Sequence, residues 1–195
     1  MLVFNELKED VLKRAKAANA CTDEYKRAYK AETKEELLQV IVDNVIWCYQ
    51  NKMLDTPYML EHFIDLFDQF GIYATGHHCI ENKNTILIGD SSATIETWDS
   101  SSATIKTCGS SSATIKTWDS SSATIETCGS SSATIKTWGS SSATIKTWDS
   151  SSATIETWGS SSATYQLSGD YSTIKDMNQH KLLVKKSKFE IIEIE

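Results

Sequence analysis

The stretch that decides the fold runs from Ser101 to Ser120 and reads SSATIKTCGS SSATIKTWDS, two near-identical units of ten residues. The same decapeptide occurs seven times over residues 91–160, as Ser-Ser-Ala-Thr-Ile-(Glu/Lys)-Thr-(Trp/Cys)-(Asp/Gly)-Ser. Degenerate copies flank it, Thr85–Asp90 before and Ser162–Leu167 and Ser172–Lys175 after. Self-similarity at a fixed period with atypical ends indicates a stacked repeat architecture.

Each decapeptide alternates through its centre with the period of a β-strand. In the unit that begins at Ser101, one side holds Ala103, Ile105 and Thr107, and the other side holds the intervening Ser, Thr, Lys and Cys residues. Identical units stacked at about 4.8 Å would place equivalent side chains in continuous ladders. We therefore predict a mainly β protein, a tightly wound β-solenoid whose inward core ladder is Ile95, Ile105, Ile115, Ile125, Ile135, Ile145 and Ile155.

The number of residues in one coil is open between ten and twenty. The Trp/Cys position reads W, C, W, C, W, W, W along the array, and the charged position reads E, K, K, E, K, K, E. Because neither series alternates throughout, we favour one coil per ten-residue repeat. Cys108 and Cys128 distinguish the two alternatives, since they would be about 9.6 Å apart with ten residues per coil and neighbours with twenty.

The N-terminal region has helical periodicity instead. Apolar residues recur at helical spacing over Leu2–Ala18 and over Leu37–Ile46, and the second run follows a capping box at Thr33–Glu36. Thr56-Pro57 predicts a further helix start, with proline in the first turn. We predict an α-helical capping domain over residues 1–75 that covers an open edge of the solenoid.

The remaining boundaries follow from the repeat. We predict a junction and first rung over residues 76–90, the decapeptide-repeat solenoid over 91–177, and C-terminal strands over 178–195. The last segment contains two strand-like runs, Lys181–Val184 and Phe189–Glu195. Their charged residues would protect an exposed edge, or the strands would pair with a second copy in a homodimer.

Charge and composition narrow the classes of partner. The formal net charge of −7 provides no basic surface for nucleic acid or an anionic membrane. No apolar run approaches the length of a membrane span, and the first residues lack the layout of a signal peptide. We expect a cytoplasmic protein whose five cysteines are free thiols, with no cofactor.

No catalytic or metal-binding constellation stands out. The histidines, His62, His77, His78 and His180, lie outside the repeats and outside recognisable nucleophile or metal motifs. His77-His78-Cys79 lacks a fourth ligand at a metal-site spacing, so we interpret it as a polar linker. The serines recur identically in every unit, as turns require. We expect no catalytic residue, no metal site and no enzyme activity.

The outward side of the repeat is the candidate interaction surface. The mixed Glu and Lys column is expected to form a water-facing charge ladder that keeps the sheet soluble and in register. The aromatic column could shield the backbone, mediate self-association through a solenoid face, or stack on a ligand. This possible interaction ladder consists of Trp98, Trp118, Trp138, Trp148 and Trp158.

Two resemblances bear on function. SSATIKTW-type decapeptides after a helical head containing WCYQNK (Trp47–Lys52) resemble a family of uncharacterised repeat proteins of gut bacteria and their phages. This resemblance implies a solenoid with a helical cap and no established activity. The repeat is also similar to insect antifreeze solenoids, but Thr104 is followed two residues later by Lys106 where a Thr-x-Thr row would need threonine. We therefore expect a structural or protein-interaction module; the alternative is a surface that binds ice or glycan.

Overall fold

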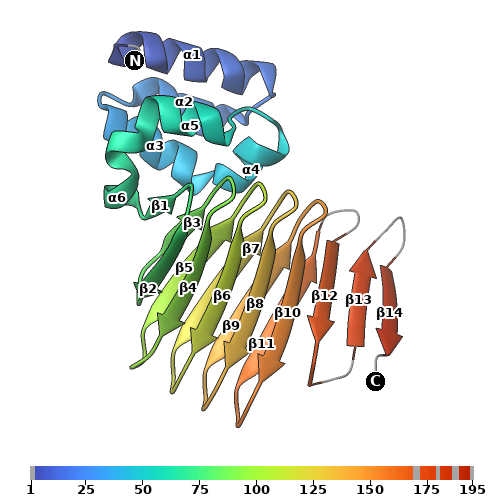
Figure 1. Cartoon of the computed structure of the whole chain (residues 1–195). Helices are drawn as coiled ribbons and strands as arrows, with labels where there is room; N and C mark the ends of the chain where they lie inside the picture. The colour runs from blue at the N-terminus through green and yellow to red at the C-terminus, as the bar shows by residue number, and fades with distance from the viewer. Residues whose placement is uncertain (1–2, 169–171, 179–180, 186–188, 194–195) are drawn as a thin grey trace. The chain divides into compact units, whose positions relative to one another are not determined.

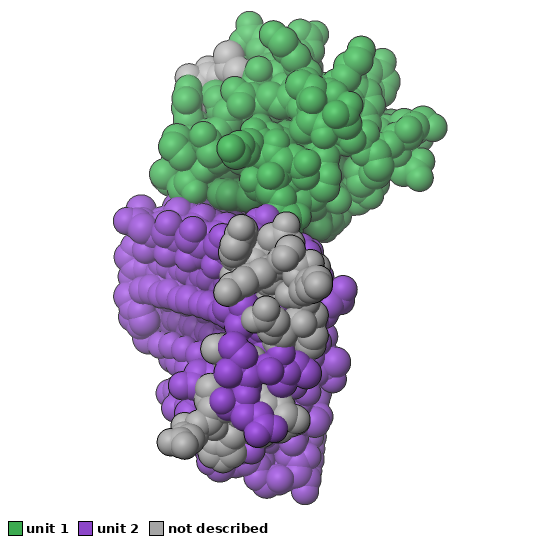
Figure 2. Space-filling model, turned by 90° about the vertical axis from the view of Figure 1, so that its right-hand side faces the viewer, with its two compact units in different colours: residues 1–70 green, residues 71–195 purple. Residues whose placement is uncertain are grey.

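The structure is a computed structural model that describes residues 3–168, 172–178, 181–185 and 189–193. The chain divides into two compact units, residues 1–70 and residues 71–195, which are coloured separately in Figure 2. The first unit is helical and the second is a β-solenoid, so the predicted fold class is confirmed. The helical unit ends a few residues earlier than the predicted boundary at 75, because the first strand already begins at Ile72.

The helical unit is built from short helices, two of which start at a side-chain cap. Thr33 Oγ1 accepts a hydrogen bond from Glu36 N at 3.2 Å, and Asp55 Oδ1 accepts one from Tyr58 N at 2.9 Å. The elements are α1 (Phe4–Ala17), α2 (Thr22–Lys30), α3 (Lys34–Asp43), α4 (Val45–Gln50), α5 (Thr56–Phe63), the 3₁₀ turn η1 (Ile64–Leu66) and α6 (Phe67–Phe70). The core of the unit includes Leu37, Leu38 and Phe63, which are completely buried.

Two sheets form the solenoid, as Figure 1 shows. Sheet A has the order β1-β3-β5-β7-β9-β11, with β1 (Ile72–Tyr73), β3 (Thr85–Leu87), β5 (Ser102–Thr107), β7 (Ser122–Thr127), β9 (Ser142–Thr147) and β11 (Ser162–Leu167). Sheet B has the order β14-β13-β12-β10-β8-β6-β4-β2. Its strands are β2 (His77–Glu81), β4 (Ser92–Thr97), β6 (Ser112–Thr117), β8 (Ser132–Thr137), β10 (Ser152–Thr157), β12 (Ser172–Asp176), β13 (Lys181–Lys185) and β14 (Phe189–Glu193).

Each coil of the repeat array takes twenty residues, so the prediction of one coil per ten-residue repeat is wrong. Strand β4 pairs in parallel with β6, not with β5, and the register places Ile95 beside Ile115. The same offset joins β5 to β7, where Ile105 lies beside Ile125. One decapeptide holds one six-residue strand and one corner, and it needs a second decapeptide on the opposite sheet to bury its inward side.

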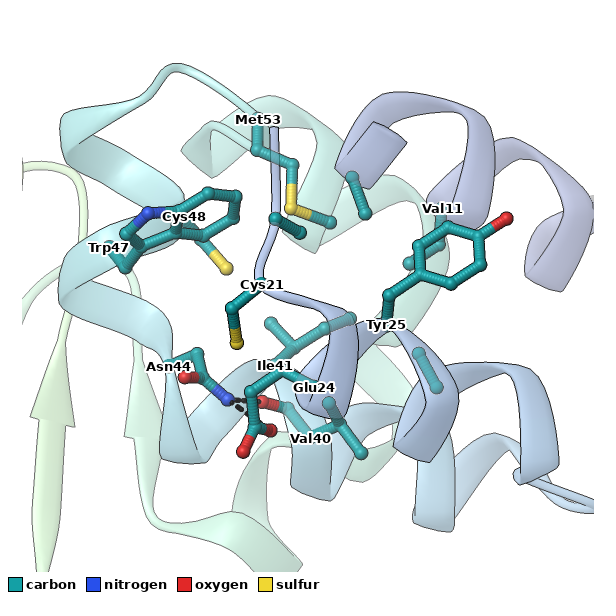
Figure 3. Close-up of a pocket in the computed structure, with 13 residues that line it drawn as sticks. Val11, Cys21, Glu24, Tyr25, Val40, Ile41, Asn44, Trp47, Cys48 and Met53 are labelled. Atoms are coloured by element: carbon teal, nitrogen blue, oxygen red, sulfur yellow. Dashed lines mark hydrogen bonds between the residues drawn. The ribbon is translucent and has the colours of Figure 1, made fainter. Parts of the chain in front are cut away.

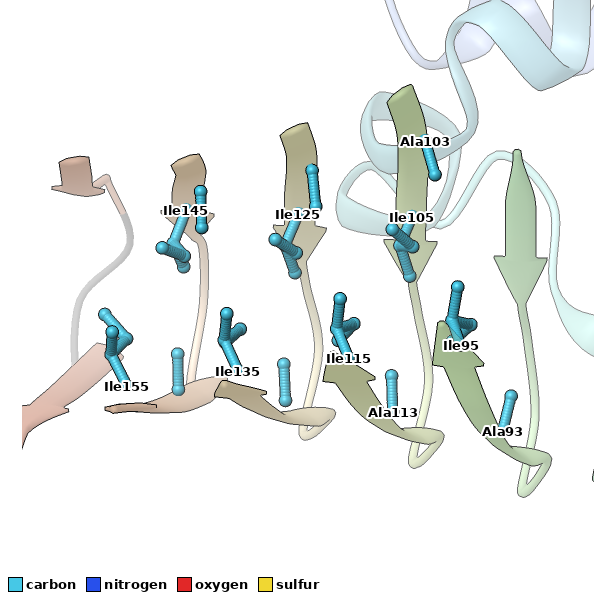
Figure 4. Close-up of a cluster of buried hydrophobic side chains, with 14 of the residues drawn as sticks. Ala93, Ile95, Ala103, Ile105, Ala113, Ile115, Ile125, Ile135, Ile145 and Ile155 are labelled. Carbon is cyan, nitrogen blue, oxygen red and sulfur yellow. The ribbon is translucent and has the colours of Figure 1, made fainter. Parts of the chain in front are cut away.

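The interior is a single column of small and branched side chains. Isoleucines from sheet A and sheet B point toward one another, as Ile105 and Ile125 do opposite Ile95 and Ile115 in Figure 4. All seven isoleucines of the ladder are completely buried, and the alanine two residues before each is nearly so. The threonine two residues after each isoleucine is also buried in all but the last complete repeat. The narrow Ala-Ile-Thr interior leaves the two sheets in direct contact.

The Asp/Gly position of the repeat occupies the left-handed region of the backbone at every corner. Its φ is +61° at Asp119, +72° at Gly129 and +57° at Asp149. Aspartate and glycine are among the residues that tolerate this conformation. At Gly129 a Cβ atom would also lie 2.9 Å from the carbonyl oxygen of Gly109 in the preceding coil, so the backbones approach closely there.

The two ends of the solenoid differ from its middle. His77-His78-Cys79 is the start of β2, which pairs with β4, so the predicted polar linker is wrong. This segment lacks the alternation of polar and apolar residues that identifies a strand, because His78 stands beside Ala93 at an inward position where the repeats have an apolar residue. At the other end, β13 pairs antiparallel with β12 and β14 antiparallel with β13, which extends sheet B alone.

Candidate interaction surface

Twenty-residue coils divide the aromatic ladder between two corners. We call residues 98–101, 118–121, 138–141 and 158–161 the tryptophan corner, because Trp98, Trp118, Trp138 and Trp158 occupy equivalent positions there. We call residues 88–91, 108–111, 128–131 and 148–151 the cysteine corner. Trp148 belongs to this second corner, in one column with Cys108 and Cys128. The structure therefore brings four of the five predicted tryptophans into one column and places the fifth elsewhere.

The tryptophan corner is an aromatic column. The ring centroids of Trp118 and Trp138 are 4.6 Å apart with an interplanar angle of 35°. Those of Trp138 and Trp158 are 4.8 Å apart at 5°. The Trp138 ring therefore has a neighbour on each side, and the column presents mostly ring edges outward. Trp158 is the most accessible member, at 39% exposure.

Buried hydroxyl groups hold both corners in place. At the tryptophan corner, Ser121 Oγ lies within hydrogen-bond distance of two carbonyl oxygens, at 3.0 Å from Thr97 O and 2.8 Å from Trp118 O. At the cysteine corner, Ser131 Oγ is 3.1 Å from Thr107 O and 2.7 Å from Cys128 O. These contacts join each coil to the preceding one, so a side chain at either corner projects from a fixed backbone.

Ion pairs cover the outer faces between the corners. On sheet B, Lys116 Nζ lies 2.9 Å from Glu96 Oε1, and Lys136 Nζ lies 3.2 Å from Glu156 Oε2. On sheet A, Lys146 Nζ lies 3.5 Å from Glu126 Oε1. Partly exposed pairs of this kind contribute little to stability, about 0–1 kcal/mol each. Their effect is to place fixed, mutually compensated charge on both flat faces.

Two of the histidines lie at the N-terminal end of the solenoid. His77 Nδ1 is 3.0 Å from Ser92 Oγ, and His78 Nε2 is 2.8 Å from the carbonyl oxygen of Thr75. The Tyr73 ring lies against His78, with centroids 4.3 Å apart. The His77–Ser92 contact is on the surface, since the His77 side chain is exposed. A histidine bonded to a serine can activate it as a nucleophile only inside a site that also orients the base and stabilises an oxyanion.

The third histidine described, His62, is buried in α5. Its Nε2 lies 3.8 Å from Glu61 Oε1, and its Nδ1 has no hydrogen-bond partner within the described part of the chain. His180 falls outside the described residues. Within those residues, no group of three or more His, Cys, Asp or Glu side chains is arranged to hold a metal ion.

The helical unit contains an apolar cavity of about 190 Å³ (Figure 3). Side chains of α1 to α4 and their connections line it, among them Val11, Ile41 and Met53. Asn44 Nδ2 donates to Glu24 Oε2 at 2.9 Å, which satisfies two polar groups at its wall. An apolar cavity of roughly 150 Å³ can accept a molecule the size of benzene, so this one has room for a small apolar molecule. The sequence does not predict this cavity, because a cavity between helices depends on packing that periodicity does not reveal.

Comparison of the chain with protein-family models, curated proteins and solved structures found no match. The resemblance to the decapeptide-repeat family therefore stays an expectation. Across the residues that the structure describes, no helix is both long and apolar enough to cross a membrane.

Proposed function

We propose that the chain is a non-enzymatic structural or protein-interaction module, a rigid solenoid that contacts a protein partner through its tryptophan corner. The observation that carries the proposal is the row of ring contacts between Trp118, Trp138 and Trp158 along one corner. Tryptophan is enriched in the energetically dominant positions of protein interfaces because it buries a large apolar area with few rotatable bonds. A straight row of such residues on a fixed backbone costs little conformational entropy to bind.

The ring geometry favours a protein partner over a carbohydrate. A sugar stacks on the face of an aromatic ring, and the faces inside this column are occupied by neighbouring rings. Trp158, at the end of the stack, has Lys136 Nζ 5.8 Å from its ring centroid. The column therefore offers an extended strip of ring edges, which suits a long contact with another polypeptide surface.

The partner that we propose is a second copy of the chain. Both copies would present a column with the same repeat along its length, about 4.8 Å, so two columns packed side by side would match at every coil. A twofold axis between them makes the contact self-complementary. The edge strand β14 is the other candidate contact, since Ile191 is 57% exposed and Ile192 is 44% exposed there.

The test is light scattering of the full-length protein over a wide concentration range, with tryptophan fluorescence recorded in parallel. We expect a dimer that Trp138→Ser together with Trp158→Ser dissociates. The matched control is Trp148→Ser, which removes a tryptophan from the cysteine corner and should leave the dimer intact. A wild-type protein that stays monomeric at its highest soluble concentration, or a dimer broken only by Ile192→Lys, would remove the tryptophan corner from the proposal.

Binding of ice is the second candidate, and one observation favours it. The outward Ser and Thr columns lie in register on both sheets, as in the pairing of Ser102 with Ser122 and Thr104 with Thr124. The neighbouring columns contain ion pairs, and charge holds water in a liquid-like arrangement. We therefore expect no thermal hysteresis; a clear hysteresis gap that Thr124→Lys abolishes would make ice binding the function instead.

A further inference from the structure

The repeat array contains two cysteines, and both lie at the cysteine corner. They are on consecutive coils, each directly after a strand of sheet A. Cys108 follows β5 and Cys128 follows β7, and these strands are paired in register. Cys128 N donates to Thr107 O at 2.8 Å, which continues the ladder into the corner. The two Sγ atoms are 2.8 Å apart, and both side chains are completely buried. We propose that Cys108 and Cys128 form an intrachain disulfide that joins two adjacent coils.

The backbone spacing brings the two residues within reach of this bond. Paired strands are separated by about 4.8 Å, inside the range of about 4.4–6.8 Å between the Cα atoms of disulfide-bonded cysteines. Because the two residues are equivalent positions of one repeat, their Cα–Cβ bonds point the same way and their Cβ atoms are also about 4.8 Å apart. Bond formation therefore requires the Cβ atoms to approach by a few tenths of an ångström, toward the range of about 3.5–4.5 Å found in disulfides. The next residue of the column is Trp148 and the preceding one is Ile88, so the column offers one thiol pair.

The other cysteines have different surroundings. Cys21 and Cys79 are exposed, and Cys48 is buried within the helical unit. The sequence predicted five free thiols, and the twenty-residue coil is what separates two of them from the rest. A solenoid with ten residues per coil would have left this pair too far apart to react.

The chemistry is an exchange with a small disulfide such as oxidised glutathione. The thiolate of one cysteine attacks a sulfur of the oxidant and forms a mixed disulfide, which releases one small thiol. The second cysteine, after losing its proton, attacks the protein sulfur of that mixed disulfide and releases the second small thiol. Two protein thiols are oxidised, one small disulfide is reduced to two thiols, and the protons pass to the released thiolates.

Burial determines when the reaction takes place. Neither sulfur can meet the oxidant while the corner is closed, so oxidation occurs during folding or in a transiently opened corner. Once formed, the bond is shielded from reductants in the same way. It restricts the unfolded chain by closing a loop, so the oxidised protein should unfold at a higher temperature than the reduced protein.

Tryptic mapping tests the proposal directly on the full-length protein. Cleavage after Lys106, Lys116 and Lys136 puts Cys108 in peptide 107–116 and Cys128 in peptide 117–136. The reduced protein is incubated with oxidised glutathione, in one sample when folded and in another during refolding from denaturant. Free thiols are then blocked at low pH before digestion. We expect the two peptides to appear as one disulfide-linked species in the refolded sample, and more slowly in the folded one.

The exposed cysteines provide an internal control, because Cys21 and Cys79 should carry glutathione in both samples and so report that the oxidant was active. The double variant Cys108→Ser, Cys128→Ser should lose the difference in unfolding temperature between oxidised and reduced protein. Unlinked peptides in both samples, with Cys21 and Cys79 modified, would overturn the proposal. A link that appears only between different chains, seen as a dimer on a non-reducing gel, would overturn it as well.

Discussion

The two corners of the solenoid share a backbone and differ mainly in the side chain at the eighth position of the repeat. Asp119 at the tryptophan corner and Gly129 at the cysteine corner both have a φ between +60° and +75°, namely +61° and +72°. A buried serine closes each corner onto the preceding coil, Ser121 in one case and Ser131 in the other. The corner is therefore formed by its Asp/Gly and Ser residues. The eighth position of the repeat is free to carry tryptophan for contact with a partner or cysteine for a covalent link.

The largest effect is expected from breaking the shared backbone at the cysteine corner. Gly129→Val places a β-branched side chain at φ +72°, with its Cβ 2.9 Å from Gly109 O. We expect the free energy of unfolding to fall by about 3 kcal/mol, the upper range for a strained backbone position. Gly129→Asp is the matched control, since aspartate occupies the same column at Asp149, and should be much milder. Denaturant unfolding followed by circular dichroism measures the stability of both variants. Equal losses of stability would show that the contact with Gly109, and not the branching of the side chain, causes the destabilisation.

The next-largest effect is expected at the buried serines, and it tests whether they stabilise the two corners equally. Ser131→Ala and Ser141→Ala each remove a buried hydroxyl that contacts two carbonyl oxygens and accepts a hydrogen bond from a threonine, at 3.2 Å in both cases. Each substitution should lower the free energy of unfolding by about 2 kcal/mol, because buried partners lose their hydrogen bonds. The comparison of the corners is wrong if one variant is as stable as the wild type and the other is not.

A smaller difference in stability is expected between substitutions at the eighth position of the two corners. Trp138→Ser removes a ring that contacts two others, whereas Trp148→Ser removes a ring for which the described residues show no ring contact. Aromatic pairs contribute about 1 kcal/mol beyond the area that they bury, so Trp138→Ser should be the more destabilising by at least that amount. Thermal unfolding of the two variants under conditions that keep both monomeric isolates this difference from dimer formation.

The smallest effect should come from the faces between the corners. Lys146→Gln removes an ion-pair partner of Glu126, and Lys116→Gln removes an ion-pair partner of Glu96. The second variant also relieves the pairing of Lys116 beside Lys136 in the sheet. We expect Lys146→Gln to lower stability by about 0.5 kcal/mol and Lys116→Gln by less, with both differences vanishing at high salt. A large loss of stability that does not depend on salt, in either variant, would show that the charged column stabilises the fold as core residues do.

The solenoid could be predicted from the sequence because the alternation within each repeat identifies the residues that face inward. The alternation around Ile105 identifies a strand, and repetition implies stacking. The coil length was missed because Ile105 would have an identical neighbour, Ile115 or Ile125, in either register. A signal was present at the eighth position: every second unit, from Trp98 to Trp158, carries tryptophan without exception. The other units do not alternate with them strictly, because Trp148 interrupts the cysteine column.

The candidate interaction surface could be predicted only in part. The tryptophans could be recognised as an outward column, but their division between two corners depends on the coil length. Strand alternation predicts Cys108 and Cys128 on the outward side with the tryptophans. Both are completely buried, because the chain has already begun to turn at the eighth residue. The cavity beside Met53 and Ile41 could not be predicted, since it reflects how helices with ordinary periodicity pack.

The pairing of each repeat strand with the strand after next has a genetic consequence. Duplication of a single decapeptide would move each later strand to the opposite sheet and exchange the two corners from that point on. Strand β12, which continues sheet B after β10, would then continue sheet A. Gain or loss of two repeats would change the length by one coil and preserve every column. The array can therefore evolve in length only by even numbers of repeats, unless its C-terminal strands change as well.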